Sequence, residues 1–188
     1  ITVAKLKPTI SLTASSLKMK AGQSTTAFKA AGLAKGDYVT RVTSGNTGIV
    51  KVSSVTKKGA FRLTAGKKAG STTVKVILAS KKSASFKVTV QRGVVKTSKI
   101  TVSTKSVTLK KGTTYRKLAS SVKVTPVTSQ EKVTYTSSNK KIVTVTSGGV
   151  IKGLKKGKKY YVKVRSYKTV NGKRIYGAYS TAKKATIK

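Results

Sequence analysis

Apolar and polar residues alternate along almost the whole chain, which is the period-2 pattern of half-buried β-strands. In residues 86–90, Phe, Val and Val occupy every second position, with Lys and Thr between them. No segment shows a sustained apolar stripe with the 3.6-residue period of a helix. The pattern predicts an all-β chain with no helix longer than one turn. In the first half, strands are expected at residues 10–12, 17–19, 25–28, 37–42, 49–52, 61–63, 74–78 and 86–90.

The pattern of the first half restarts near residue 100. Ile10 corresponds to Ile100 at a shift of 90 positions, and Asn46 corresponds to Asn139 at a shift of 93. A repeat of about 90 residues that keeps the apolar alternation marks two tandem domains. Roughly seven short strands in each are typical of a β-sandwich. We assign residues 1–92 to the first domain, residues 93–99 to a linker and residues 100–188 to the second domain.

The clearest copy of the repeated segment is residues 135–145, which read as strand, polar turn and strand, and residues 43–52 are a weaker copy. Together with residues 100–112 and the glycines Gly149, Gly153 and Gly157, this segment resembles the bacterial immunoglobulin-like domain of group 2. That family is known from invasin- and intimin-type adhesins and from Gram-positive surface proteins. The resemblance implies two tandem immunoglobulin-like β-sandwiches with a spacer or adhesion role. Tyr135 stands where the family usually has Trp, and Val42 stands there in the first domain.

The end of the second domain departs from this family pattern. Residues 160–167 resemble the late strands of a fibronectin type III domain, in which Tyr160 would occupy the tyrosine-corner position. Asn171-Gly172 predicts a two-residue type I′ turn. Residues 174–179 then return as the second strand of a hairpin.

The net charge of the chain is more informative about its partners than any motif. Among 188 residues there are 42 Lys and Arg against two acids, Asp37 and Glu131, for a formal charge of +40. Solubility of a small domain needs a net charge of only about 2–8, so this excess indicates an acidic partner. Most of the basic residues are Lys, which favours diffuse attraction to polyanions over base readout by Arg. Anionic polymers such as teichoic acids and anionic glycans are the expected partners, with nucleic acid bound only non-specifically.

Composition argues against catalysis and against cofactors. The chain has no His and no Cys, and its two acids lie in different domains, so no paired-carboxylate site can form within one domain. Calcium sites need six to eight oxygen ligands, usually with several carboxylates. We therefore expect no enzyme activity, no metal and no cofactor. One covalent alternative is a Lys–Asn isopeptide bond beside Glu131 or Asp37, which would require a buried acid with a raised pKa.

The late hairpin holds the best candidate for a specific site. If Val162 and Val164 face the core, the alternating residues of the same strand form an exposed strip of aromatics and cations. Such strips stack on sugars or bases while they hold anionic groups. Alternatively, the tyrosines only form cross-strand pairs that stabilise the hairpin. The predicted ligand-binding residues are Tyr161, Lys163, Arg165 and Tyr167 on one strand and Lys173, Arg174 and Tyr176 on the other.

These observations predict a monomeric, non-catalytic structural and adhesion module, secreted or attached to the wall of a Gram-positive bacterium, whose Lys-rich surface binds polyanions. A nucleic-acid-binding module and a passive stalk spacer remain alternatives. No run approaches the roughly 18 apolar residues of a membrane span, so no membrane insertion is expected. The chain begins at Ile1 inside an alternating segment, which predicts a piece of a larger protein.

Overall fold

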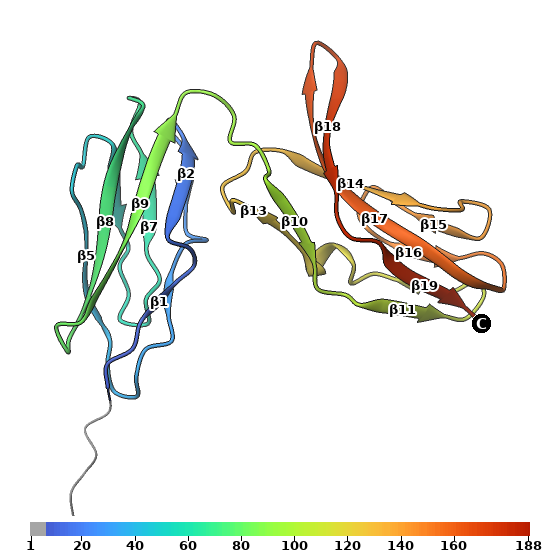
Figure 1. Cartoon of the computed structure of the whole chain (residues 1–188), viewed down its shortest axis with the longest axis horizontal. Coiled ribbons are helices and arrows are strands. Elements are labelled where there is room, and N and C mark those ends of the chain that lie inside the picture. Colours follow the sequence, from blue (N-terminus) through green and yellow to red (C-terminus); the bar gives the residue numbers. More distant parts are fainter. Residues whose placement is uncertain (1–6) are drawn as a thin grey trace, which may run out of the picture. The chain divides into compact units, whose positions relative to one another are not determined.

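The computed structural model describes residues 7–188, except for the side chains of residues 157–159. It divides into two compact units, Ile1–Val95 and Lys96–Lys188 (Figure 1). The described chain is built from strands, with a single turn of 3-10 helix at Ala119–Ser121, which confirms the all-β prediction. The division falls inside the segment predicted as a linker. Thr97 and Ser98 in that segment form hydrogen bonds within the second unit, to Glu131 and Thr125.

The first unit is a sandwich of two sheets. The four-stranded sheet has the order β2-β9-β8-β5, and β2 runs parallel to β9 while the other pairs are antiparallel. The second sheet has the order β3-β7-β6, and β1 pairs with β4. The strands are β1 (Ser11–Leu12), β2 (Ser16–Lys20), β3 (Ser24–Thr25), β4 (Ala30–Ala31), β5 (Val39–Ser44), β6 (Val50–Ser53), β7 (Arg62–Ala65), β8 (Gly70–Leu78) and β9 (Ser83–Gln91).

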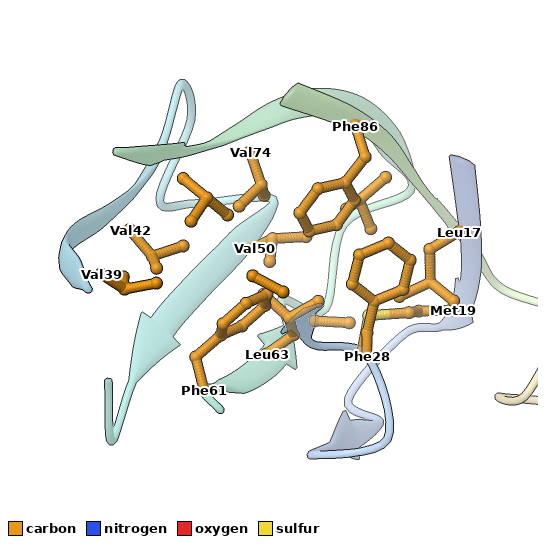
Figure 2. Close-up of a cluster of buried hydrophobic side chains, with 14 of the residues drawn as sticks. Leu17, Met19, Phe28, Val39, Val42, Val50, Phe61, Leu63, Val74 and Phe86 are labelled. Carbon is orange, nitrogen blue, oxygen red and sulfur yellow. The ribbon is translucent and has the colours of Figure 1, made fainter. Parts of the chain in front are cut away.

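The core of the first unit lies between these sheets and centres on three phenylalanines (Figure 2). The rings of Phe28 and Phe86 stack with their centroids 4.0 Å apart, and Phe61 lies 6.2 Å from Phe86. Val74 on β8 is fully buried, whereas the next residue, Lys75, is exposed. The alternation read from the sequence therefore separates the core from the charged outer surface.

The second unit repeats this topology strand by strand. Its larger sheet contains the strand order β11-β19-β17-β14, and β11 runs parallel to β19 as β2 does to β9. Its other sheet has the order β12-β16-β15, and β10 pairs with β13. The strands are β10 (Lys99–Val102), β11 (Ser106–Leu109), β12 (Thr114–Tyr115), β13 (Val122–Thr125), β14 (Lys132–Ser137), β15 (Val143–Val145), β16 (Ile151–Gly153), β17 (Gly157–Val170), β18 (Lys173–Tyr179) and β19 (Lys183–Ile187).

One element of the second unit has no counterpart in the first. In the first unit β8 turns directly into β9, but β17 has 14 residues and is followed by the extra strand β18 before β19. Asn171 and Gly172 join β17 to β18 with φ values of 48° and 75°, as a type I′ turn requires. Figure 1 shows the end of this hairpin extending beyond the sheets of its own unit.

The repeated segment at residues 135–145 crosses from one sheet of the second unit to the other, because β14 and β15 belong to different sheets. Asn139 shapes the crossing turn by accepting a hydrogen bond from the Lys141 N–H at 3.0 Å. Asn46 accepts the corresponding bond from the Gly48 N–H at 2.9 Å in the first unit. The motif thus encodes the connection between the two layers of each sandwich.

Candidate functional site

Strand β17 presents two chemically different faces. Val162, Val164 and Ser166 are buried in the second unit, whereas Tyr161 and Lys163 are exposed. Arg165 and Tyr167 continue the outer face and are partly covered by neighbouring side chains. The alternation therefore sorts the strand as predicted, with apolar residues inside and tyrosines and cations outside.

The hairpin register decides which residues of β18 join that outer face. Directly opposite residues of an antiparallel pair point to the same side of the sheet. Tyr176 lies opposite Tyr167, with ring centroids 6.1 Å apart, and the Arg174 guanidinium lies 4.5 Å from the Tyr167 ring centroid. Lys173 lies opposite Val170, on the other face of the ribbon. The structure brings six of the seven predicted residues to one face and leaves Lys173 out.

Tyr179 also belongs to this face, although it was not among the predicted residues. The Arg165 guanidinium carbon lies 3.6 Å from the Tyr176 ring centroid and 4.6 Å from the Tyr179 ring centroid. Strict alternation places Tyr176 and Tyr179 on opposite faces, because they are three residues apart. A β-bulge changes this: Tyr167 pairs with Tyr176 but Arg165 pairs with Tyr179, so β18 carries one extra residue.

Gly177 lies in the bulge and is required there by close packing. A Cβ atom at this position would lie 2.5 Å from the Ser166 hydroxyl oxygen, closer than non-bonded contacts allow. An isolated glycine within a strand pattern is a known signal for a bulge or a close backbone approach. Gly177 is therefore the sequence feature from which the position of Tyr179 can be inferred.

We call the resulting row of side chains the tyrosine–cation ladder. Cation–π contacts stabilise it, since a guanidinium or ammonium is attracted to the face of an aromatic ring. Within the described chain, the Nε atom of Arg165 is buried without a hydrogen-bond partner. The Lys163 ammonium lies 5.7 Å from the Tyr179 ring centroid. In spatial order, the ladder consists of Lys163, Tyr179, Arg165, Tyr176, Tyr167 and Arg174.

A small pocket adjoins the Lys163 end of the ladder. Its volume is about 230 Å³. Thr136 on strand β14 lies on the same face as Lys163 because the two residues pair, and Ser138 follows the end of the strand. The lining residues are Thr136, Ser137, Ser138, Tyr161, Lys163 and Tyr179.

Comparison with known proteins bears on the second unit. Residues 96–173 match the family model for the bacterial Ig-like domain (group 2). The matched residues cover most of the second unit. The match confirms the resemblance read from the sequence in the unit that carries the ladder. The match ends at the first residue of β18, so most of that strand lies beyond it. A search of curated protein sequences finds no match.

Several solved structures are similar to the chain at low identity. Protocadherin gamma C5 EC1-3 is 11% identical over 95% of this chain and 68% of that chain, with a TM-score of 0.36. Domains 4–9 of the surface layer protein SbsC are 19% identical over 96% of this chain and 31% of that chain, with a TM-score of 0.42. The S-layer protein rSbsC(31-844) is 17% identical over 86% of this chain and 22% of that chain, with a TM-score of 0.35. At these identities the likeness concerns the fold alone.

Glu131, the acidic residue of the second unit, has a structural role. Glu131 accepts a hydrogen bond from the Thr97 N–H at 2.9 Å. Partial burial raises the pKa of Glu131, but hydrogen bonds from Thr97 and the Ser166 hydroxyl, together with the charge of Lys168, outweigh it and hold the pKa below its usual value. Glu131 therefore stays ionised and joins the start of this unit to the loop before β14.

The parts proposed for an isopeptide bond have other partners. An isopeptide bond needs an acid with a raised pKa. The pKa of Glu131 is lowered, and so is that of Asp37, mainly because Asp37 accepts a 2.6 Å hydrogen bond from the Ser80 hydroxyl. The side-chain oxygens of Asn139 and Asn46 accept turn N–H groups. These groups stabilise loops, and their contacts do not favour an isopeptide bond.

Over residues 7–188, the structure shows no group of three or more His, Cys, Asp or Glu side chains that could hold a metal ion. In the same residues no helix has the length and hydrophobicity needed to cross a membrane.

Proposed function

We propose that this chain is a non-catalytic structural and adhesion module of a Gram-positive surface protein, and that it binds polyanions through its Lys-rich exterior. The second unit is a bacterial Ig-like domain, a class consistent with a surface structural or adhesion module. The whole chain has 42 basic residues and two acids, so internal ion pairs cannot balance its charge. The surplus produces a long-range field that attracts anionic polymers.

The tyrosine–cation ladder is the observation that carries this proposal. The two units share one scaffold, and the ladder is completed by the strand that only the second unit has. Its arginines lie against tyrosine rings instead of carboxylates. The one acid of this unit, Glu131, already binds Thr97. The ladder's positive charge therefore remains available to an external anion.

Ring contacts within the ladder favour a glycan or teichoic acid over a nucleic acid. Proteins that bind single strands commonly stack bases on aromatic rings. Tyr167 and Tyr176 contact one another, and each also contacts a guanidinium, so bases would have to displace these contacts. Phosphate or carboxylate groups can instead bind the N–H edges of guanidinium groups whose planes are held against the rings.

Competition binding in physiological salt tests the proposal. Wall teichoic acid, a heparin-like glycan, double-stranded DNA and a neutral glycan are compared on the full chain and on the double variant Tyr161→Ala/Tyr167→Ala. The control is Tyr38→Ala in the first unit, because Tyr38 is also exposed and has Lys57 5.2 Å from its ring centroid.

We expect the anionic polymers to bind and the neutral glycan not to bind. The double variant should bind the preferred polymer more weakly than the Tyr38 control does. Equal binding of every polyanion by all variants would leave only diffuse electrostatic attraction and remove the ladder from the proposal. Absence of binding to any polymer would contradict it and favour a passive spacer.

A further inference from the structure

The pocket beside the ladder combines the three kinds of group that recognise a charged sugar. Tyr161 contributes an aromatic wall that is 43% exposed, Lys163 contributes a cation, and Thr136 and Ser138 contribute hydroxyl groups. The Ser138 hydroxyl oxygen accepts the Tyr161 N–H at 3.0 Å, and the Ser137 hydroxyl oxygen accepts the Asn139 N–H at 3.2 Å. The Ser138 hydroxyl is thereby held in position and still carries a proton to donate, whereas Ser137 is buried and pairs with the core residue Val162.

The size of the pocket limits what it can hold. Sites for drug-sized ligands measure about 300–1,000 Å³. At about 230 Å³, this pocket suits one ring with a small substituent, and its lining residues Lys163 and Tyr179 belong to the ladder. A pocket of this size at the end of the ladder fits one repeating unit of a polymer whose neighbouring units continue past Arg165.

We propose that this pocket binds a single sugar ring carrying an anionic group, a carboxylate or a phosphate, as one unit of a longer anionic glycan. The inference rests on the proposed polyanion binding and names the chemistry of the repeating unit. The apolar face of the sugar packs on Tyr161, and the ammonium of Lys163 binds the anionic group. The sugar hydroxyls bind Thr136 and Ser138. The Arg165 guanidinium, whose Nε atom has no hydrogen-bond partner in the described chain, binds the anion of the next unit.

The first unit provides an internal comparison. Val76 pairs with Val42, and Val164 pairs with Tyr135 at the corresponding repeat position, so Lys75 is the counterpart of Lys163. The same alignment places Thr73 where the second unit has Tyr161 and Ile77 where it has Arg165. Lys75 therefore carries the same charge on the same kind of strand without the aromatic wall or the neighbouring guanidinium.

Nuclear magnetic resonance titration of the full 188-residue chain tests this site. The probes are glucuronate, glucose 6-phosphate, glucose, inorganic phosphate and thymidine monophosphate. We expect the two anionic sugars to shift the backbone amides of residues 136–138, 161–163 and 179, and glucose and inorganic phosphate to shift them far less. Lys163→Gln should weaken the binding of the anionic sugars about tenfold, as loss of a charged hydrogen bond predicts. Lys75→Gln should leave the pocket shifts unchanged.

Three results would overturn the inference. Shifts spread over lysine-rich turns instead of the pocket would show that charge alone attracts these probes. If Lys163→Gln and Lys75→Gln weaken the binding of the anionic sugars equally, charge alone again explains the attraction. Thymidine monophosphate shifting the pocket amides as strongly as the sugars would assign the site to nucleotides. If polymers still bind while the sugars fail, the pocket assignment alone is wrong, whereas loss of all polymer binding contradicts the proposed function.

Discussion

At the scale of single residues, a few side chains determine the shape of the binding face. Arg165 lies between Tyr176 and Tyr179, and this arrangement depends on the missing side chain of Gly177. Glu131 holds the start of the second unit and stays ionised. Each of these contacts can be removed by one substitution.

Gly177→Ala should destabilise the second unit by about 1–3 kcal/mol, because the new methyl group would lie 2.5 Å from the Ser166 hydroxyl oxygen and force the bulge to move. Polymer binding should weaken as well, since Tyr179 would lose its place beside Arg165. Denaturant unfolding and a binding titration measure the two effects. Gly148→Ala is the control, because its added Cβ would have only the Thr146 hydroxyl within 4 Å, at 3.8 Å. Equal stability of both variants would contradict the role given to Gly177.

Acid should destabilise the second unit through Glu131. The folded-state pKa of Glu131 lies below its value in the unfolded chain, so the unfolded state takes up a proton first as the pH falls. The stabilisation is complete above the unfolded pKa of about 4.3 and is lost as the pH falls through the folded pKa. Glu131→Gln should cost about 1–2 kcal/mol at pH 7 and much less at pH 3.

The chain is well suited to this measurement because it contains no His and only two side-chain carboxylates. Unfolding followed from pH 7 to pH 3 should therefore show a decline in the second unit that Glu131→Gln flattens. Asp37→Asn should flatten the corresponding decline in the first unit, where the pKa of Asp37 is also lowered. A decline unchanged by Glu131→Gln would assign the acid sensitivity to another group.

At the scale of elements, the extra strand β18 separates the two units. The scaffold strands repeat in order and direction, and the hairpin adds a ribbon with two different faces. One strand is shorter than the alternation of apolar and polar residues predicts. The strand expected at residues 25–28 ends at Thr25, whose hydroxyl oxygen accepts the Ala27 N–H at 3.1 Å, a local bond that competes with sheet pairing. Phe28 is still buried in the core.

The two faces of the hairpin should differ in binding. Lys173 and Arg174 are adjacent and each carries one charge, but only Arg174 lies on the ladder face. Arg174→Gln should weaken polymer binding several-fold more than Lys173→Gln, as competition binding can measure. Deleting residues 169–170 and 173–174 removes two cross-strand pairs from the hairpin. The turn and the face on which each remaining side chain lies are preserved. That deletion should reproduce the effect of Arg174→Gln with little change in thermal stability. Equal losses for the two point variants would show that only net charge matters.

At the scale of the whole molecule, the formal charge of +40 makes every polyanion interaction dependent on salt. Binding of double-stranded DNA should fall by about a thousandfold between 50 and 200 mM salt if six or more phosphates are neutralised. Lys163→Gln should reduce the slope of log affinity against log salt by about 1 if Lys163 contacts the polymer. Fluorescence titrations at several salt concentrations measure both quantities. A slope near zero would contradict binding driven by charge.

Sequence patterns alone predict most strands of the first unit, the repeat, the hairpin turn and the two faces of β17. These depend on local rules: period-2 alternation, a copied pattern of apolar residues, and the left-handed conformations that Asn171-Gly172 adopts. The charge and the absence of His and Cys are likewise properties of composition. The match of residues 96–173 to the bacterial Ig-like domain confirms what these patterns indicated for the second unit.

Which cations and rings meet depends on the folded arrangement of the strands. The bulge at Gly177 brings Tyr179 to the ladder, and the register leaves Lys173 on the other face. The pocket forms because β14 pairs with β17 and places Thr136 opposite Lys163, although these residues lie far apart in the chain. The lowered pKa of Glu131 arises from hydrogen bonds with Thr97 and Ser166, which are also far from Glu131 in the sequence. A local alternation rule cannot report such contacts, because they depend on how separate strands align.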